Sequence, residues 1–383
     1  MNDDIMIVIM KSKRAILLSL VALALASYSV ASAQERRPAD QDQDEAIKLK
    51  ADLVMITAAV LDRDGRAIRS LKRDEFVVFE DGVEQKIAHF SPTEEPFTVM
   101  LLLDLSGSTR DEIALMKHAA KRFLTELRKD DRVGIIVFSG DVELIADFTS
   151  DRKMLEEAID AEEPPQGSET YRFTRKTGTS FYDALLLAVE ESPLKGVEGR
   201  KAIVCMSDGV DSTSRSTYRE IATLVEKADA SVYFLELNTE EAMIRGLLKD
   251  KTDSGYINLS PSQINRYYDE FDRNSTERNQ PRDQIPPETK REIAAGLYDI
   301  ARRDMRQLAE RVGGRVYPVN ALTDLAAVYK QVAEDLRSQY SIGYYPMNET
   351  HDGKWRAVRI EVRRQGANVR ARSGYWAPGR RKS

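Results

Sequence analysis

The fold is decided by one short stretch, residues 97–108, which reads FTVMLLLDLSGS. Its first part is almost entirely apolar, as expected of a strand that is buried on both faces of a sheet. Its polar end, from Asp104 to Ser108, comes directly before a segment whose apolar residues recur at helical spacing. A buried strand, a turn and a helix in this order predict the start of an α/β domain.

The same alternation continues to about residue 337. It predicts an α/β fold with a doubly wound, mostly parallel sheet over residues 96–337. The later strands are expected at 133–138, 142–148, 201–206, 231–237 and 315–319, and the helices at 109–128, 151–159, 181–190, 218–228, 290–312 and 321–336.

Short strand patterns flank this domain at both ends of the chain. They lie at 51–60, 75–80 and 83–90 before it, and at 340–345, 355–363 and 368–373 after it. Three strands alone cannot bury two faces. We therefore expect the segments 51–95 and 338–376 to combine into one small β-sandwich, with the α/β domain inserted between its two halves.

A long polar insertion, residues 239–288, interrupts the alternation. It supplies nearly fifty residues where a connection of about 2–6 is usual. Partial disorder is one interpretation. In the other interpretation the segment begins at the carboxyl end of the predicted strand 231–237, at the same rim of the sheet as Asp104. It would then modulate access to that rim. Its acidic side chains that can reach the rim are Glu240, Glu241, Asp250, Asp253, Asp269, Glu270 and Asp272.

The N-terminus has the pattern of a secretory signal. Lys11, Lys13 and Arg14 precede the apolar run 15–26, and Ala31-Ser32-Ala33 suits signal peptidase. The alternative is a membrane anchor, which needs about 20 apolar residues. We expect a signal peptide over 1–33, a flexible leader over 34–50, a basic tail over 377–383, and a periplasmic, secreted or cell-surface protein that is not integral to the membrane after cleavage.

Composition excludes several classes of function. The chain has 383 residues with 57 Lys and Arg against 63 Asp and Glu, a net charge of −6 that gives no footprint for nucleic acid. One cysteine, Cys205, excludes a disulfide framework, and the three histidines have no zinc-ligand spacing. Because no nucleophile elbow, P-loop or zinc-protease motif occurs, we expect no catalytic residues and no enzyme.

The turn after the first buried strand carries the chemistry. Asp104, Ser106 and Ser108 follow that strand at alternate positions, at the sheet rim where ligands bind in doubly wound folds. Carboxylate and hydroxyl oxygens suit a hard divalent cation such as Mg²⁺. The alternative is that Ser106 or Ser108 only caps the following helix.

Two further loops are expected at the same rim: residues 177–185, TGTSFYDAL, and residues 205–209, CMSDG. In this order the three loops resemble the von Willebrand factor type A (VWA) domain and its metal-ion-dependent adhesion site (MIDAS). Thr177 departs from a glycine that is common in the family, and Asp211 is a second nearby carboxylate. The flanking segments 76–90 and 370–375 resemble the acidobacterial VWFA-related group of exported proteins. The resemblance implies five metal-site positions, namely Asp104, Ser106, Ser108, Thr179 and Asp208.

This ligand set implies binding rather than catalysis. Mg²⁺ characteristically keeps open or water-filled positions, with Mn²⁺ and Ca²⁺ as alternative cations. The resemblance implies that an Asp or Glu of a protein partner completes the coordination. We therefore expect an exported, divalent-metal-dependent protein-binding module for adhesion or scaffolding. The alternatives are a metal-assisted hydrolase and a structural envelope protein without metal-dependent binding.

Overall fold

The computed structural model describes residues 53–92, 95–106, 113–161, 178–191, 194, 199–253 and 256–379. The predicted signal peptide and leader lie outside these ranges, as do Ser108, Thr177 and the end of the predicted tail. Residues from Val54 onward form one compact unit. Among the described helices, none combines the length and the apolar character needed to cross a bilayer.

The middle of the chain forms a six-stranded sheet. Its strands are β5 (Phe97–Asp104), β6 (Arg132–Phe138), β7 (Val142–Thr149), β8 (Arg200–Ser207), β9 (Ser231–Leu237) and β10 (Arg315–Val319). Their order is β10-β9-β8-β5-β6-β7, and all neighbours are parallel except the β6–β7 hairpin. Every residue of β5 is buried, as its apolar sequence predicts. The predicted α/β fold with a doubly wound, mostly parallel sheet is confirmed.

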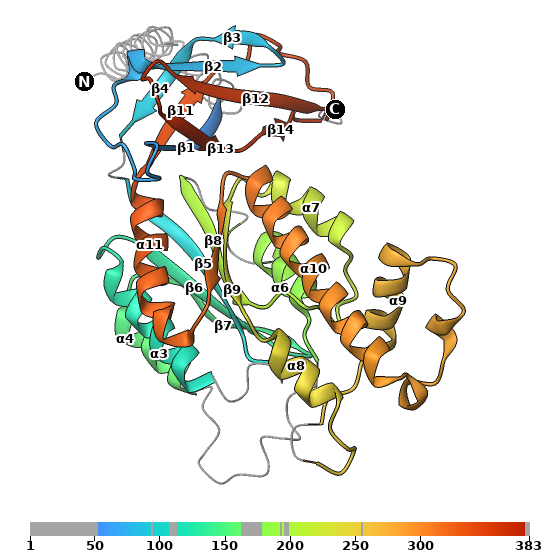
Figure 1. The fold of residues 1–383 in the computed structure, drawn as a ribbon. Helices are drawn as coiled ribbons and strands as arrows, with labels where there is room; N and C mark the ends of the chain where they lie inside the picture. Colours follow the sequence, from blue (N-terminus) through green and yellow to red (C-terminus); the bar gives the residue numbers. More distant parts are fainter. Residues whose placement is uncertain are drawn as a thin grey trace, which may run out of the picture. The chain divides into compact units, whose positions relative to one another are not determined.

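Helices cover both faces of this sheet (Figure 1). One face packs against α3 (Ile113–Glu126), α4 (Arg152–Ala161) and α11 (Leu325–Arg337). The other packs against α6 (Phe181–Leu186), α7 (Tyr218–Lys227) and α10 (Pro287–Arg311). A short π-helical turn, Leu187–Glu191, follows α6 directly.

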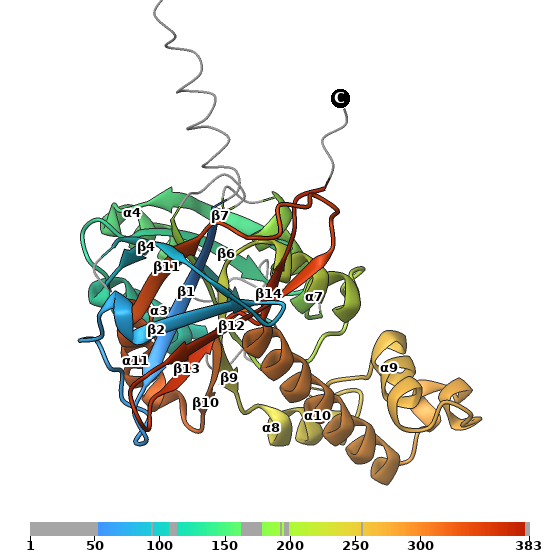
Figure 2. The same cartoon turned by 90° about the horizontal axis from the view of Figure 1, so that it is seen from above.

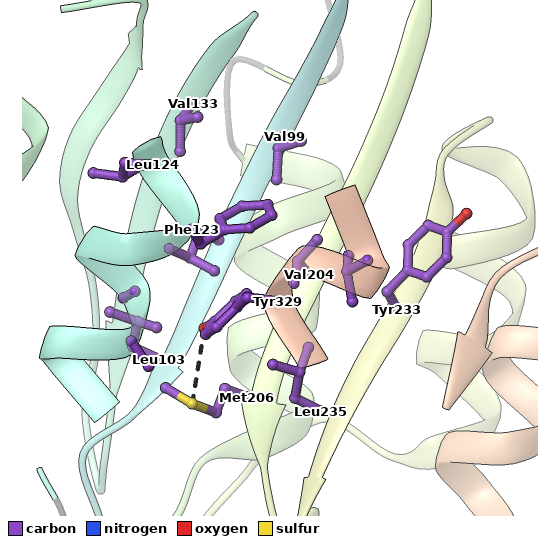
Figure 3. Packing of buried hydrophobic residues seen from close by; sticks show 14 of the residues in the cluster. Val99, Leu103, Phe123, Leu124, Val133, Val204, Met206, Tyr233, Leu235 and Tyr329 are labelled. Atoms are coloured by element: carbon purple, nitrogen blue, oxygen red, sulfur yellow. Dashed lines mark hydrogen bonds between the residues drawn. The ribbon is translucent and has the colours of Figure 1, made fainter. Parts of the chain in front are cut away.

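Alternate side chains of β5 supply the two cores. Leu101 and Leu103 lie in the cluster with α3 and α11, whereas Leu102 lies in the cluster with α6 and α10. Between α3 and α11, the rings of Phe123 and Tyr329 are 4.9 Å apart at their centroids (Figure 3). Since each fully buried apolar side chain contributes about 1.5–3 kcal/mol, these two clusters hold the strand ends of the rim in fixed register.

The two ends of the chain pair with each other in a β-sandwich. The strands are β1 (Val54–Leu61), β2 (Phe76–Glu80), β3 (Val83–Gln85), β4 (Ile87–Ser91), β11 (Gln339–Tyr344), β12 (Trp355–Val362), β13 (Asn368–Ala371) and β14 (Gly374–Trp376). They form two sheets, β13-β1-β11-β4 and β14-β12-β2-β3, around one apolar core (Figure 2). Because β1 pairs with β11 and β2 with β12, the predicted combination of the two ends is confirmed. The residue boundaries drawn between sandwich and α/β domain stay predictions.

Two predicted strands of the sandwich are wrong in extent. The predicted strand 83–90 is divided into β3, which pairs with β2, and β4, which pairs with β11 in the other sheet. Likewise β13 ends at Ala371, and β14 continues in the opposite sheet. A strand can change its hydrogen-bonding partner at such a corner without a turn, and neither Gly nor Pro lies between Gln85 and Ile87, so the sequence pattern did not reveal the change of sheet there.

The insertion 239–288 is folded, and the interpretation as a partly disordered segment is wrong for its described residues. It contains α8 (Glu240–Leu247), α9 (Pro261–Phe271) and two 3-10 turns, Glu277–Asn279 and Arg282–Gln284, before α10 begins. Widely spaced apolar residues give it a core against α10, which includes Leu247, Leu259, Ile264, Tyr268, Ile285, Ile293 and Leu297. In both views α9 lies alongside α10 (Figures 1 and 2).

Candidate metal centre

The candidate centre lies where the strand order of the sheet reverses. From β5 the chain continues to β6 on one side, while β8 lies on the other. Such a switch point leaves a crevice at the carboxyl ends of the strands, where open α/β sheets bind ligands. Asp104 ends β5 and Asp208 directly follows β8, so the two predicted carboxylates flank the crevice.

Asp104 is fully buried, and both of its carboxylate oxygens are engaged. The backbone N–H of Ser106 donates to Oδ1 at 3.0 Å, and the Ser207 hydroxyl donates to Oδ2 at 2.5 Å. Ser207 is the last residue of the neighbouring strand β8, and Leu103 pairs with Met206 just before. The parallel register of β5 and β8 therefore orients the Asp104 side chain.

Asp208 is oriented by one residue close in sequence and by two distant ones. The N–H of Val210 donates to Oδ1 at 3.0 Å. Oδ2 accepts the hydroxyl of Thr239 at 2.5 Å and that of Tyr298 at 3.3 Å, and these two hydroxyl oxygens are 2.7 Å apart. Burial and the charge of Asp208 raise the pKa of Tyr298, so its hydroxyl keeps the proton that it donates.

Thr179 is held against the loop that follows β8. Its N–H donates to the Ser212 hydroxyl at 2.7 Å, and its carbonyl accepts the N–H groups of Ser212 and Thr213 at 2.9 and 3.2 Å. Gly178 has a φ of +126°, and a Cβ there would lie 2.4 Å from the Thr213 methyl group. This close approach requires glycine directly before Thr179 and brings Thr179 to the rim.

Asp211, the second nearby carboxylate, has a different position. Its Oδ1 accepts the N–H of Phe181 at 3.0 Å and the hydroxyl of Ser214. Phe181 is the first residue of α6, so Asp211 satisfies a backbone donor at the start of that helix. Burial raises the pKa of Asp211 to about 6. Its contacts make it a brace for α6.

The electrostatics of the rim follow from two acids in one buried place. Burial, together with the charge of Asp208, raises the pKa of Asp104 to about 7, although hydrogen bonds from Ser106 and Ser207 favour the ionised form. The hydrogen bonds from these donors are thus too weak to offset the cost of a second negative charge buried next to Asp208. A divalent cation reverses this balance, because it attracts both carboxylates.

The donor set fits a hard divalent cation. Among the described residues, no three His, Cys, Asp or Glu side chains form a group suited to a metal ion. The candidate set instead combines two carboxylates with hydroxyls, all of them oxygen donors. Asp104, Ser106, Thr179 and Asp208 are all buried and belong to the three rim segments. Ser108, the fifth predicted position, lies outside the described residues.

Four residues that orient the site were missed in the sequence. Ser207 precedes Asp208 directly, and its position at the end of a strand next to β5 was available as a signal. Ser212 and Thr239 lie in loops without a distinctive pattern. Tyr298 is 90 residues from Asp208 and sits within an ordinary amphipathic helix, so nothing local identified it.

The chain is similar to proteins of several organisms at low sequence identity. An uncharacterized protein of Borreliella burgdorferi is 20% identical over 166 residues, which are 41% of this chain and 45% of that protein. The match thus spans less than half of the relative's length. Two solved structures are also similar to this chain. The protein BatB from Bacteroides thetaiotaomicron is 22% identical and covers 62% of this chain and 98% of its own, with a TM-score of 0.37. Proximal thread matrix protein 1 from the mussel byssus, with a zinc-occupied MIDAS motif, is 13% identical and covers 66% of this chain and 48% of its own, with a TM-score of 0.40.

The family comparison concerns the α/β part of the chain. The sequence model of the von Willebrand factor type A domain matches residues 99–210. The matched range begins within β5 and ends just after Asp208, so it includes Asp104, Ser106, Thr179 and Asp208. Together with the doubly wound sheet and its rim, this match shows that the chain contains a von Willebrand factor type A domain.

Proposed function

We propose that this protein is a divalent-metal-dependent binding module that recognises a carboxylate of a protein partner. The observation that carries the proposal is the pair of buried aspartates, Asp104 and Asp208, at the switch point of the sheet. Burial and, after it, the charge of Asp208 raise the pKa of Asp104, so the two acids lie in each other's field. Such a pair, with hydroxyls beside it, is chemically suited to Mg²⁺, Mn²⁺ or Ca²⁺.

Each carboxylate is oriented from both sides by the chain. A backbone N–H two residues later fixes one oxygen of Asp104 and one of Asp208. A hydroxyl from another segment fixes the other oxygen, namely Ser207 for Asp104 and Thr239 for Asp208. Outer hydrogen bonds of this kind typically tune metal affinity about 10–100-fold.

The predicted donors leave room for a partner. Asp104, Ser106, Ser108, Thr179 and Asp208 supply five oxygens, whereas Mg²⁺ takes about six. A bound cation would supply an electrophilic position for an Asp or Glu side chain of the partner. The role of the chain is then to bind and orient the cation, which matches the implication of the VWA resemblance.

We also propose that the module is not catalytic. A hydrolase would need a base beside the metal. His89 lies on β4 of the sandwich, His118 on the exposed side of α3, and His351 after β11, so none belongs to the described rim segments. Asp211 is occupied as a brace for α6.

An exported protein is the corresponding proposal for location. It rests on the signal-peptide pattern of residues 1–33, with a partner at the cell envelope or outside the cell. A folded module with one buried cysteine, Cys205, suits an oxidising compartment, because burial prevents mispairing.

The test is metal-dependent capture of a partner from a cell-envelope extract. The full mature chain is immobilised with Mn²⁺, then with EDTA, then with Mn²⁺ restored. We expect a partner that is released by EDTA and retained again with Mn²⁺. The Asp208→Ala variant should capture nothing, whereas Asp130→Asn, which changes an exposed carboxylate away from the rim, should behave as wild type. Capture that is insensitive to EDTA and to Asp208→Ala would overturn the proposal.

A further inference from the structure

The N-terminus of α9, in the insertion, contacts the loop that holds Thr179. Ser260 caps this helix, since its hydroxyl accepts the N–H of Gln263 at 3.2 Å. The same hydroxyl donates to the carbonyl of Ser212 at 3.0 Å, and the hydroxyl of Ser262 donates to that carbonyl at 2.6 Å. Helix capping needs one hydroxyl, so the second one is not explained by the helix itself.

Ser212 connects these two hydroxyls to the candidate centre. Its side chain accepts the N–H of Thr179 at 2.7 Å, and its own N–H donates to the Thr179 carbonyl at 2.9 Å. Ser212 therefore accepts the two hydroxyls of α9 with its carbonyl, and it binds the Thr179 backbone with its side chain and its N–H. A shift of α9 changes the position of Ser212, and with it the position of the Thr179 backbone.

A second connection runs from α9 to the helix that begins after Thr179. The guanidinium of Arg266 donates to the hydroxyl of Tyr182 and, at 2.5 Å, to Oδ2 of Asp304. Asp304 is 1% exposed, and the Tyr182 hydroxyl donates to it at 2.8 Å. Removing one partner from a buried charged network of this kind is strongly unfavourable. Arg266 thus fixes α9 against both α6 and α10.

The insertion also holds the other carboxylate of the rim. Thr239 is the N-cap of α8, and Tyr298 belongs to the core that α10 shares with α8 and α9. Both hydroxyls donate to Asp208. Four of the seven acidic side chains expected to reach the rim form ion pairs elsewhere: Glu240 with Arg302, Glu241 with Arg245, Asp269 with Arg278 and Glu270 with Arg303. The contacts of the insertion therefore support Thr179, through Ser212, and Asp208, through Thr239.

We infer that residues 239–288 position the metal-binding residues Thr179 and Asp208, so that docking of α9 and binding of the cation stabilise each other. This inference rests on the proposed metal-binding function. The insertion, expected from the sequence to modulate access to the metal, would instead support the residues that bind it. Because coupling between two sites is reciprocal, loss of α9 contacts lowers cation affinity, and the cation in turn protects α9 from opening.

The experiment uses the full chain with four variants. Ser260→Ala/Ser262→Ala removes both hydroxyls that reach Ser212, and Ser262→Ala removes only the one that is not the helix cap. Ser260→Thr/Ser262→Thr keeps both hydroxyls. Ser275→Ala removes another hydroxyl of the insertion, which accepts the Glu277 N–H at 3.3 Å and has no role at the rim.

Two measurements are made on each variant. Calorimetric titration gives the Mn²⁺ affinity, and hydrogen exchange of the amides of residues 262–271, with and without Mn²⁺, gives the opening of α9. We expect the double alanine variant to bind Mn²⁺ about tenfold more weakly, within the usual range of site coupling. Mn²⁺ should slow exchange in α9 of the wild type and much less in that variant. Ser262→Ala should show a smaller loss, and the threonine and Ser275→Ala variants none.

Failure of this inference is separable from failure of the proposed function. If wild type binds Mn²⁺ through Asp104 but the double alanine variant binds it equally well, with no Mn²⁺ effect on α9 exchange, the supporting role of the insertion is wrong while the metal site stands. If wild type binds no Mn²⁺, both are wrong.

Discussion

Two regions of this molecule bury carboxylates, and they do so in opposite ways. In the sandwich, Glu80 is 2% exposed and its Oε2 accepts the hydroxyls of Tyr344 and Tyr375 at 2.8 and 2.9 Å. At the rim of the VWA domain, Asp104 also accepts a hydroxyl, but burial together with the charge of nearby Asp208 raises its pKa to about 7. One buried acid with two neutral donors is a stable structural element. Two acids in each other's field are stable only when one of them keeps its proton or a cation lies beside them.

A like charge beside a buried acid distinguishes a functional acid from a structural one. Burial and hydrogen bonding are common to Glu80 and Asp104, so neither distinguishes them. The difference is the like charge beside Asp104, together with its place at the switch point of the sheet. Opposite responses to mutation are therefore expected in the two regions.

The largest expected effect is in the sandwich. Glu80→Ala leaves the hydroxyls of Tyr344 and Tyr375 without their acceptor in a buried core. We expect the free energy of unfolding to fall by roughly 3–5 kcal/mol, from unsatisfied donors and a cavity. Thermal and denaturant unfolding measure this loss. Glu80→Gln keeps an acceptor and should lose far less, and a Mn²⁺ affinity altered by Glu80→Gln would contradict the separation of the two regions.

The second effect has the opposite sign. In the metal-free protein Asp104→Asn removes a buried charge that is unfavourable beside Asp208, while an oxygen remains for the Ser106 N–H. At about pH 8 we expect the metal-free variant to be more stable than wild type by roughly 2 kcal/mol, since one pKa unit corresponds to about 1.4 kcal/mol. Added Mn²⁺ should stabilise wild type and not the variant. Denaturant unfolding in EDTA and in Mn²⁺ measures both differences in the free energy of unfolding. A variant that is less stable than wild type in EDTA would count against the buried acid pair.

The third effect is a pH dependence at the rim. The pKa of Asp104 is raised from 3.8 to about 7, so in the metal-free fold this group keeps its proton up to a higher pH than in the unfolded chain. Its contribution to stability is therefore present below about pH 4 and is lost as the pH rises through about 7. Metal binding needs the ionised form, so Mn²⁺ affinity should rise by up to tenfold per pH unit below about pH 7 and level off above it, with release of one proton.

Calorimetry in buffers of different ionisation enthalpy measures that proton. An affinity that stays constant between about pH 5.5 and 7 would contradict the raised pKa of Asp104. The exposed carboxylate variant Asp130→Asn serves as the control, since it should keep the wild-type pH profile.

The smallest effect concerns the orientation of Asp208. Tyr298→Phe removes the weaker of its two hydroxyl donors, at 3.3 Å, while Thr239 at 2.5 Å remains. We expect a loss of a few-fold in Mn²⁺ affinity, below the about 10–100-fold typical of residues that orient metal ligands, because this bond is long and the Thr239 bond remains. Thr239→Val removes the shorter bond and should cost more. Equal affinities in both variants and wild type would show that these hydroxyls serve only the packing of α10.

Local sequence patterns were sufficient for much of this structure. The apolar run of β5 and the helical spacing after it predicted the strand, its burial and the sheet, because both faces of a central strand must be apolar. The polar residues at its end predicted the rim, because parallel strands end on one side. Those signals lie within a few residues of each other.

Nonlocal contacts were not predictable in the same way. The change of sheet after Gln85 is marked by neither a glycine nor a proline, so the sequence shows no boundary there. The insertion is polar overall, and its core depends on isolated residues such as Leu259 and Ile285 that meet only in the folded chain. Ser260, Pro261 and Gln263 did carry a helix-start signal, since a Ser cap, Pro at the first turn and Gln at the third position favour α9.

Calorimetric titration of Mn²⁺ into wild type, Asp104→Asn and Glu80→Gln at about pH 8, where Asp104 is ionised, separates the acid pair of the rim from the buried acid of the sandwich. All three proteins keep a buried residue of similar shape at the changed position, so folding is preserved. We expect one Mn²⁺ site in wild type and in Glu80→Gln, and none in Asp104→Asn. Equal binding by wild type and Asp104→Asn would contradict this expectation.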